Sequence, residues 1–168
     1  MKFKSVSRIV CGLVICLSSA AWAQFGLEDP DWNESEVPPP PAFDIGKLVT
    51  FEVSPNSSLV YGVDPASISI STSDGLVRYV MVASSASGAR NVMYEAIRCA
   101  TGEFKTYARY SPEGRWSMVA NPEWRSLFDN MPSKHALRFA KAGACDNAAP
   151  ATSVNALVSR LKNRMTHQ

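Results

Sequence analysis

The sequence predicts an α+β fold in which an antiparallel β-sheet is followed by C-terminal helices and one disulfide joins the two parts. Residues 43–119 contain short runs of β-branched and aromatic residues separated by turn signals, whereas residues 121–168 contain signals for helix starts and ends. Cys99 and Cys145 fall one in each part. We therefore expect a single α+β domain over residues 43–168.

Residues 1–23 have the features of a cleavable secretory signal peptide. Three basic residues precede an apolar run at 9–17, and the segment ends with the small-residue pattern Ala-Trp-Ala at 21–23. The apolar run is shorter than the ~20 residues that a helix needs to cross a bilayer, which argues against a membrane anchor. We expect cleavage after Ala23 and a location in the periplasm, with association with the outer membrane as the alternative.

Loss of residues 1–23 changes both the charge and the cysteine content. Basic residues fall from 17 to 14 against 15 acidic residues, so the positive charge that would favour nucleic-acid binding disappears. Of the four cysteines, Cys99 and Cys145 remain. Because an oxidising compartment favours disulfides, we expect these two to pair, and chain entropy puts such a bridge at up to about 4 kcal/mol.

Residues 24–42 form an acidic, proline-rich arm. The arm carries five acidic residues and no basic residue, and it includes four prolines at 38–41. This composition cannot bury enough apolar surface to offset the entropy of ordering, so we expect a disordered spacer with Trp32 as its one large apolar anchor. The alternative is an arm that folds back onto residues 43–168, which hold 14 basic and 10 acidic residues.

From residue 47 onward the chain has the pattern of successive strands. We expect strands at 47–53, 67–71, 76–82, 91–100, 104–110 and 116–119. The fourth and fifth of these form a hairpin around a three-residue loop that contains glycine. If Ala100 lies opposite Phe104, Glu95 faces Arg109 as a cross-strand pair of opposite charge, and Tyr107 shares the face of Glu95.

Three helices are expected after the sheet. The first begins at 121–123, where Asn-Pro-Glu supplies a capping side chain, a proline at the first helical position and an acid in the first turn. The second covers 134–142 and ends at Gly143, which places Cys145 within reach of the sheet. The third covers 153–165 and carries one narrow apolar stripe, so we expect it to pack on the sheet rather than on a membrane.

The residues supply no motif for metal binding, cofactor binding or catalysis. Cys99 and Cys145 are better used as a disulfide than as zinc ligands outside the cell. His135 is the one plausible general base, and we expect it to be exposed in the first turn of a helix. The serines at 84–87 lack the sequence of a nucleophile elbow. We therefore expect no catalytic, cofactor or metal site, and favour a protein that is not an enzyme.

Arginines beside aromatic residues are the most distinctive feature of the domain. Such residues form hot spots in binding surfaces and stack on sugars. They equally cover one face of a sheet, where arginine stems pack along aromatic rings, so both interpretations stay open. The candidate binding residues are Tyr94, Arg98, Tyr107, Arg109, Trp116, Trp124 and Arg125.

Several of these residues lie in a part of the chain that resembles a known family. Residues 92–103, together with Trp116, the run Pro-Glu-Trp-Arg at 122–125 and Cys145, look like the cryptic neisserial protein family. Its members are uncharacterised small exported proteins of Gram-negative bacteria. The resemblance spans residues 47–145. It implies the periplasm and a single domain, and it brings no catalytic residue.

These observations favour a non-enzymatic periplasmic or envelope-associated domain that binds another envelope protein or a glycan. The arginine and aromatic set is the candidate surface, and the arm at 24–42 is a tether or a second contact. The alternative is a small periplasmic hydrolase that acts on an envelope substrate. A concave pocket with convergent polar groups around a carboxylate or histidine would favour the hydrolase.

Overall fold

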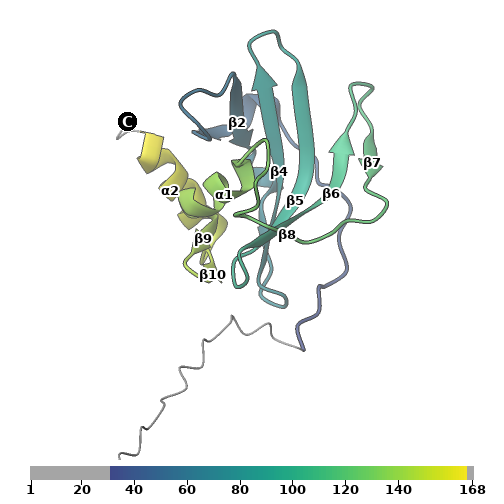
Figure 1. Cartoon of the computed structure of the whole chain (residues 1–168), viewed down its shortest axis with the longest axis vertical. Helices are drawn as coiled ribbons and strands as arrows, with labels where there is room; N and C mark the ends of the chain where they lie inside the picture. Colours follow the sequence, from purple (N-terminus) through teal and green to yellow (C-terminus); the bar gives the residue numbers. More distant parts are fainter. Residues whose placement is uncertain (1–30, 166–168) are drawn as a thin grey trace, which may run out of the picture.

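The central layer of the molecule is one antiparallel sheet. A computed structural model of the chain describes residues 31–165 (Figure 1), so the predicted signal peptide at 1–23 lies outside the described residues. The eight strands follow the order β1-β2-β4-β5-β6-β7, with β3 paired to β4 and β8 paired to β6. The strands are β1 (Val49–Phe51), β2 (Leu59–Val63), β3 (Ser69–Ile70), β4 (Leu76–Ser85), β5 (Arg90–Arg98), β6 (Glu103–Tyr110), β7 (Trp116–Met118) and β8 (Arg125–Ser126).

The helices at 135–144 and 154–165 follow the sheet in the chain and cover one of its faces (Figure 1), which confirms the predicted α+β class. None of the helices within residues 31–165 combines the length and the apolar character that crossing a bilayer requires. The elements are the 3-10 turns η1 (Ile45–Lys47) and η2 (Pro65–Ser67), α1 (His135–Phe139) with its π-helical continuation η3 (Ala140–Ala144), the short strands β9 (Cys145–Asp146) and β10 (Ala149–Pro150), and α2 (Val154–Met165).

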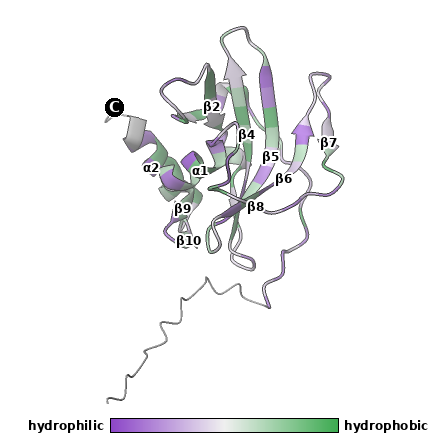
Figure 2. Cartoon of the chain, in the orientation of Figure 1, coloured by the Kyte–Doolittle hydropathy of each residue, from purple (hydrophilic) through white to green (hydrophobic). Residues whose placement is uncertain are grey.

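The sheet separates two clusters of buried side chains. Alternate residues of β4 face opposite sides, so that Val77 and Tyr79 pack under the helices while Val80 and Val82 pack on the other face. Figure 2 shows β4 largely green, whereas α2 carries both green and purple residues. Because both of its faces are covered, β4 has a nearly continuous apolar run in the sequence instead of an alternating one.

A β-bulge in the hairpin β5–β6 changes the expected register. Ile97 pairs with Phe104, but Tyr94 pairs with Ala108, which leaves Tyr107 as the extra residue. Tyr107 therefore packs beside Tyr94, with ring centroids 5.4 Å apart, on the face away from the helices. The prediction that Tyr107 shares the face of Glu95 is wrong because a bulge shifts the side-chain alternation by one residue.

The predicted pairing of Glu95 with Arg109 is also wrong, since Glu95 lies opposite Thr106. β5 ends at Arg98 and β6 begins at Glu103, so the hairpin loop covers residues 99–102 and lies earlier in the chain than the predicted loop at 101–103. A shift of the loop changes every cross-strand partner of β5.

The helix predicted to begin at 121–123 does not form. Instead, β8 pairs with the start of β6, and the backbone N–H of Leu127 donates to the carbonyl of Gly102 at 2.8 Å. Pairing with the edge of the sheet outweighs a local capping signal, because helix propensity is a weak term. β2 is absent from the predicted strands because Gly62 interrupts its apolar pattern.

The end of the second helix and the disulfide agree with the prediction. Cys99 and Cys145 are bonded, with their Cα atoms 5.7 Å apart, and they join the end of β5 to the residue that follows η3. Gly143 adopts a φ of 148° and lies against α2, where an added Cβ would come within 2.8 Å of the Cβ of Arg160. Only glycine permits both this backbone conformation and this approach.

Candidate functional site

Residues 31–43, which we name the N-terminal strap, lie across the sheet face that the helices leave open (Figure 1). They form neither helix nor strand. This corrects the expectation of a disordered arm for residues 31–42, because charge and aromatic contacts hold the strap on the domain. The surface beneath the strap, named the strap face, consists of Asp74, Arg78, Tyr94, Arg98, Lys105, Tyr107, Tyr110, Trp116 and Trp124.

The carboxylate of Glu34 occupies a polar niche of the strap face. One of its oxygens lies 2.5 Å from Nζ of Lys105, and the other accepts the hydroxyl hydrogen of Tyr107 at 2.5 Å. Burial raises the pKa of Tyr107, and its hydrogen bond to Glu34 and the charge of that carboxylate raise the pKa further. Tyr107 therefore remains a hydrogen-bond donor, and this niche is suited to a carboxylate.

Trp32 contacts the strap face through its ring and through its indole nitrogen. The guanidinium carbon of Arg98 lies 3.7 Å from the ring centroid, which is a cation–π contact. Trp124 packs against the same ring edge-to-face, with centroids 5.9 Å apart. The indole N–H donates to the backbone carbonyl of Asp74 at 2.9 Å. An aromatic side chain is thus held on three sides.

Ser35 joins the strap to a buried ion pair. Its hydroxyl and its backbone N–H both reach Oδ2 of Asp74, at 2.5 and 3.1 Å. The same carboxylate oxygen lies 2.7 Å from Nη2 of Arg78, which also donates to the Ser35 hydroxyl at 3.1 Å. Burial alone would raise the pKa of Asp74, but the hydrogen bonds from Arg78 and Ser35 outweigh it and hold the pKa well below its ordinary value. The pair therefore stays charged under the strap.

The far end of the strap is fixed by aromatic packing. Phe43 packs edge-to-face against Tyr110 and Trp116, with centroid distances of 5.2 and 6.0 Å. The backbone N–H of the next residue, Asp44, donates to the carboxylate of Asp64 at 2.8 Å. The strap therefore has a polar half at 32–35 and an apolar end next to η1.

The strap face unites five of the seven residues that the sequence suggests for binding, namely Tyr94, Arg98, Tyr107, Trp116 and Trp124. Tyr94 and Tyr107 are only 1% and 2% exposed, so the strap and their neighbours cover them. The remaining two, Arg109 and Arg125, are exposed and line a hollow on the helix side of the sheet. The candidate set is thus divided between two faces.

Sequence reasoning missed three of the four charged residues of the strap face, namely Asp74, Arg78 and Lys105. Lys105 and Asp74 sit in a strand and a turn whose patterns carry no sign of a distant partner. Arg78 does leave a signal, because it is the one charged residue in an otherwise apolar run at 76–82. A charge inside a buried strand needs a partner, and here that partner is Asp74.

A second polar cluster lies under α1. The carboxylate of Glu95 is fully buried, and both of its oxygens lie near Nε2 of His135, at 3.0 and 3.1 Å. Tyr79 and Thr106 donate hydroxyl hydrogens to the same carboxylate at 3.1 and 3.0 Å. Burial raises the pKa of Tyr79, and the charge of Glu95 and their hydrogen bond add to that shift. On the other side of the imidazole, Nδ1 lies 3.0 Å from Oγ of Ser133.

The expectation that His135 is exposed is therefore wrong. His135 is 5% exposed because α1 turns this side chain toward the sheet, where Glu95 accepts its hydrogen bond. The pair lines a hollow of about 280 Å³ that also contains Thr106, Arg109 and Arg125. Convergent polar groups at a hollow are the arrangement that would favour a hydrolase.

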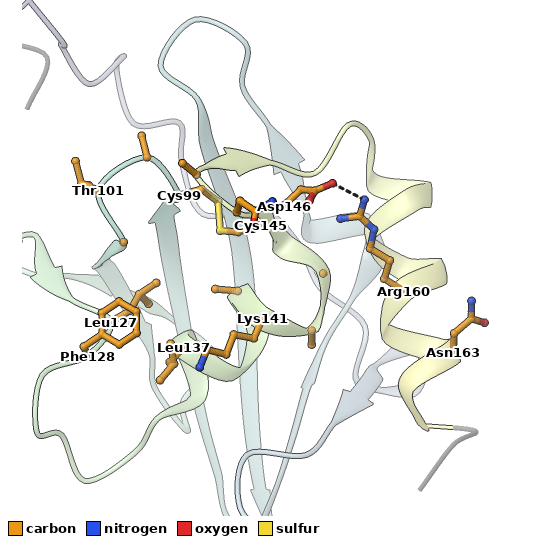
Figure 3. Close-up of a pocket in the computed structure, with 17 residues that line it drawn as sticks. Cys99, Thr101, Leu127, Phe128, Leu137, Lys141, Cys145, Asp146, Arg160 and Asn163 are labelled. Atoms are coloured by element: carbon orange, nitrogen blue, oxygen red, sulfur yellow. Dashed lines mark hydrogen bonds and ion pairs between the residues drawn. A yellow bond between two sulfur atoms is a disulfide. The ribbon is translucent and has the colours of Figure 1, made fainter. Parts of the chain in front are cut away.

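A hollow of about 870 Å³ lies beside the disulfide (Figure 3). Leu127, Phe128 and Leu137 form an apolar wall, and Lys141 lies near them. On the other side of the disulfide, Asp146 forms an exposed ion pair with Arg160. Residues 31–165 contain no group of three or more acidic, histidine or cysteine side chains placed to hold a metal ion.

Comparison with curated proteins found no match, and neither did comparison with solved structures. One family model matches residues 27–162, a span that includes the strap, the sheet and nearly all of α2. That model describes the CNP1-like family, whose members are uncharacterised. Because the match covers most of the chain, this protein belongs to the CNP1-like family.

Proposed function

We propose that this chain is an exported envelope protein that works as a non-enzymatic binding domain, and that the strap face is its binding surface. The observation that carries the proposal is the recognition of Glu34 by Lys105 and Tyr107 beside the aromatic site of Trp32. The strap face already holds an extended segment through side chains of several kinds.

The composition of the strap face supports binding to a protein. Binding energy at protein interfaces concentrates in tryptophan, tyrosine and arginine, and these residue types make up most of this face. A structural cover needs only an apolar surface, whereas Arg78, Arg98 and Lys105 bring three cations beneath the strap. Buried cations are costly unless they meet a specific partner, so they favour recognition of a defined chemistry.

Two features support export. The segment 1–23 has the basic, apolar and small-residue order of a secretory signal. The bond between Cys99 and Cys145 is of the kind that persists in an oxidising compartment. Cell fractionation with mass spectrometry of the intact protein tests this part of the proposal. We expect a periplasmic protein that begins at Gln24 and carries no free thiol; a cytoplasmic chain with residues 1–23 attached would contradict it.

A capture experiment tests the binding surface. The mature chain is immobilised and exposed to envelope extract beside a variant with Lys105→Ala and a control with Lys141→Ala, which lies far from the strap face. We expect one or more envelope proteins to be retained by the wild type and the control, and recovery to fall in the Lys105→Ala variant. Equal recovery from all three chains would show that the strap face is not the binding surface. Recovery of a glycan without any protein would show that the partner is a glycan.

A second candidate function rests on the row Ser133, His135 and Glu95. The imidazole lies between a hydroxyl and a carboxylate at 3.0 Å from each, as in a hydrolase in which histidine takes the proton of an attacking serine. It ranks second because Oγ of Ser133 already bonds the Tyr61 hydroxyl at 3.1 Å and accepts the backbone N–H of His135 at 3.3 Å. Ester hydrolysis that is lost in Ser133→Ala would favour the hydrolase.

A further inference from the structure

We propose that the N-terminal strap is an internal ligand, and that the strap face accepts from another protein an extended peptide with an aromatic residue two positions before a carboxylate. This inference rests on the proposed binding function and names the ligand class of that site. In the strap these two positions are Trp32 and Glu34.

The manner in which the strap is held resembles recognition of a peptide more than completion of a fold. Residues 31–43 add no strand to the sheet, so their register is not fixed by a ladder of backbone bonds. Instead, separate sites receive successive side chains: the ring of Trp32, the carboxylate of Glu34 and the hydroxyl of Ser35. The intervening Asn33 and the following Glu36 are exposed. Bound side chains interspersed with exposed ones are typical of an extended ligand whose side chains enter separate pockets.

The carboxylate position is the selective one. Without Glu34, the ammonium group of Lys105 would lose its partner at 2.5 Å while its side chain is only 11% exposed. Lys105 also lies 4.6 Å from the ring centroid of Trp124, a contact that holds the ammonium group at this position. A ligand that covered Lys105 without supplying an anion would leave a buried cation unpaired, which is unfavourable, so the site favours a segment with a carboxylate at this position.

The strap leaves hydrogen-bonding capacity unused. The Nε–H groups of Arg78 and Arg98 are buried and have no hydrogen-bond partner within residues 31–165. Both guanidinium groups contact the strap, Arg78 through Ser35 and Arg98 through Trp32. A buried donor without a partner is costly, so a ligand with additional acceptors at this place would bind more tightly than the strap does.

Tethering explains why the strap occupies the face in the isolated chain. A segment joined directly to β1 through η1 competes at an effective concentration in the millimolar range or above. A free peptide of the same chemistry therefore binds weakly to the wild type, and its apparent affinity rises once the strap is weakened. This competition makes the inference testable without knowledge of the natural partner.

The test uses the full mature chain, 24–168, in three forms: wild type, the opened variant Trp32→Ala/Glu34→Gln, and the control Asn33→Ala/Glu36→Gln. The control removes the same charge from exposed neighbours. The probe is a fluorescently labelled synthetic peptide with the sequence of residues 31–43, and anisotropy reports its binding. We expect the opened variant to bind the peptide at least about tenfold more tightly than the wild type and the control. A peptide with the same two substitutions should not bind.

Hydrogen exchange of the wild type tests the same inference and does not depend on whether the opened variant folds. In the wild type, the backbone N–H of Ser35 is bonded to Asp74, so its hydrogen exchange reports whether the strap is seated. Excess unlabelled peptide should accelerate exchange at Ser35, and the substituted peptide should not. Unchanged exchange in the wild type, together with equal affinity of all three chains, would overturn the inference. If the peptide fails while capture of an envelope protein still depends on Lys105, the proposed function stands and only this ligand class is wrong.

Discussion

The two faces of the sheet are covered by different means. On the helix face, apolar residues of η3 and α2 bury an apolar surface, and the disulfide fixes the chain between them. On the strap face, a segment without secondary structure is held by one cation–π contact, one carboxylate niche and one buried ion pair. The first arrangement gains most from area removed from water, whereas the second gains from specific partners. The helix face is therefore suited to stability and the strap face to exchange.

The largest expected effect comes from the helix face. Phe139 is fully buried and packs between Phe51 and Tyr79, with ring centroids 5.5 and 4.5 Å away. We expect Phe139→Ala to lower the free energy of unfolding by about 4 kcal/mol, because it leaves a cavity between two rings. Urea denaturation followed by tryptophan fluorescence measures this loss. Met118→Ala, at an exposed position of β7, is the control. If Phe139→Ala lowered the free energy of unfolding as little as the control does, the helix face would not be the main source of stability.

The buried ion pair of the strap face gives the next effect, and this effect depends on pH. The pKa of Asp74 lies below its ordinary value of 3.8, so its contribution to stability is complete above about pH 4 and falls as the pH drops toward the lowered pKa. We expect Asp74→Asn to cost about 2 kcal/mol at pH 7 and progressively less below pH 4, since hydrogen bonds to charged groups are worth about that much.

Unfolding of wild type and Asp74→Asn between pH 3 and pH 7 tests this dependence. Glu52→Gln, which changes an exposed carboxylate directly after β1, serves as the control and should show no such trend. A difference between wild type and Asp74→Asn that stays constant or grows as the pH falls would mean that Asp74 is not held in its charged form by Arg78.

The contrast between the faces also explains what the sequence could predict. The helices at 134–142 and 153–165 depend on signals within one segment, namely the stop at Gly143 and a stripe of apolar residues, and both agree with the structure. The disulfide follows from cysteine count and compartment. Such features are local or compositional, so a single sequence contains them.

The strap face could not be predicted in this way. Glu34 meets Tyr107 across 73 residues, and Tyr107 reaches this face only because a bulge interrupts the alternation of β6. The acidic composition of the arm indicates which charge the domain must offer, but not which lysine or tyrosine offers it. The same holds for His135, whose partner Glu95 lies 40 residues away on a strand with a shifted register.

Loss of the aromatic anchor should have a moderate effect. We expect Trp32→Ala to lower the free energy of unfolding by about 1 kcal/mol, the scale of a partly exposed cation–π and edge-to-face pair. Asn33→Ala, one position along the strap, should change it by less than about 0.5 kcal/mol. A loss for Trp32→Ala as large as that for Phe139→Ala would show that the strap belongs to the core, and would weaken its role as an exchangeable ligand.

The smallest expected effect on stability comes from an exposed ion pair, which can be compared with the buried pair of Asp74 and Arg78. Asp146 and Arg160 on the helix side form an ion pair at 3.0 Å, as close as many buried pairs, but their side chains are 55% and 40% exposed. Water screens such a pair, so we expect Asp146→Asn to change the free energy of unfolding by no more than about 0.5 kcal/mol. The matched substitution Asp74→Asn in the buried pair should cost several times more, although both remove one carboxylate charge from an arginine. Urea denaturation measures both losses. Equal losses for the two variants would show that burial beneath the strap does not strengthen the ion pair of Asp74 and Arg78.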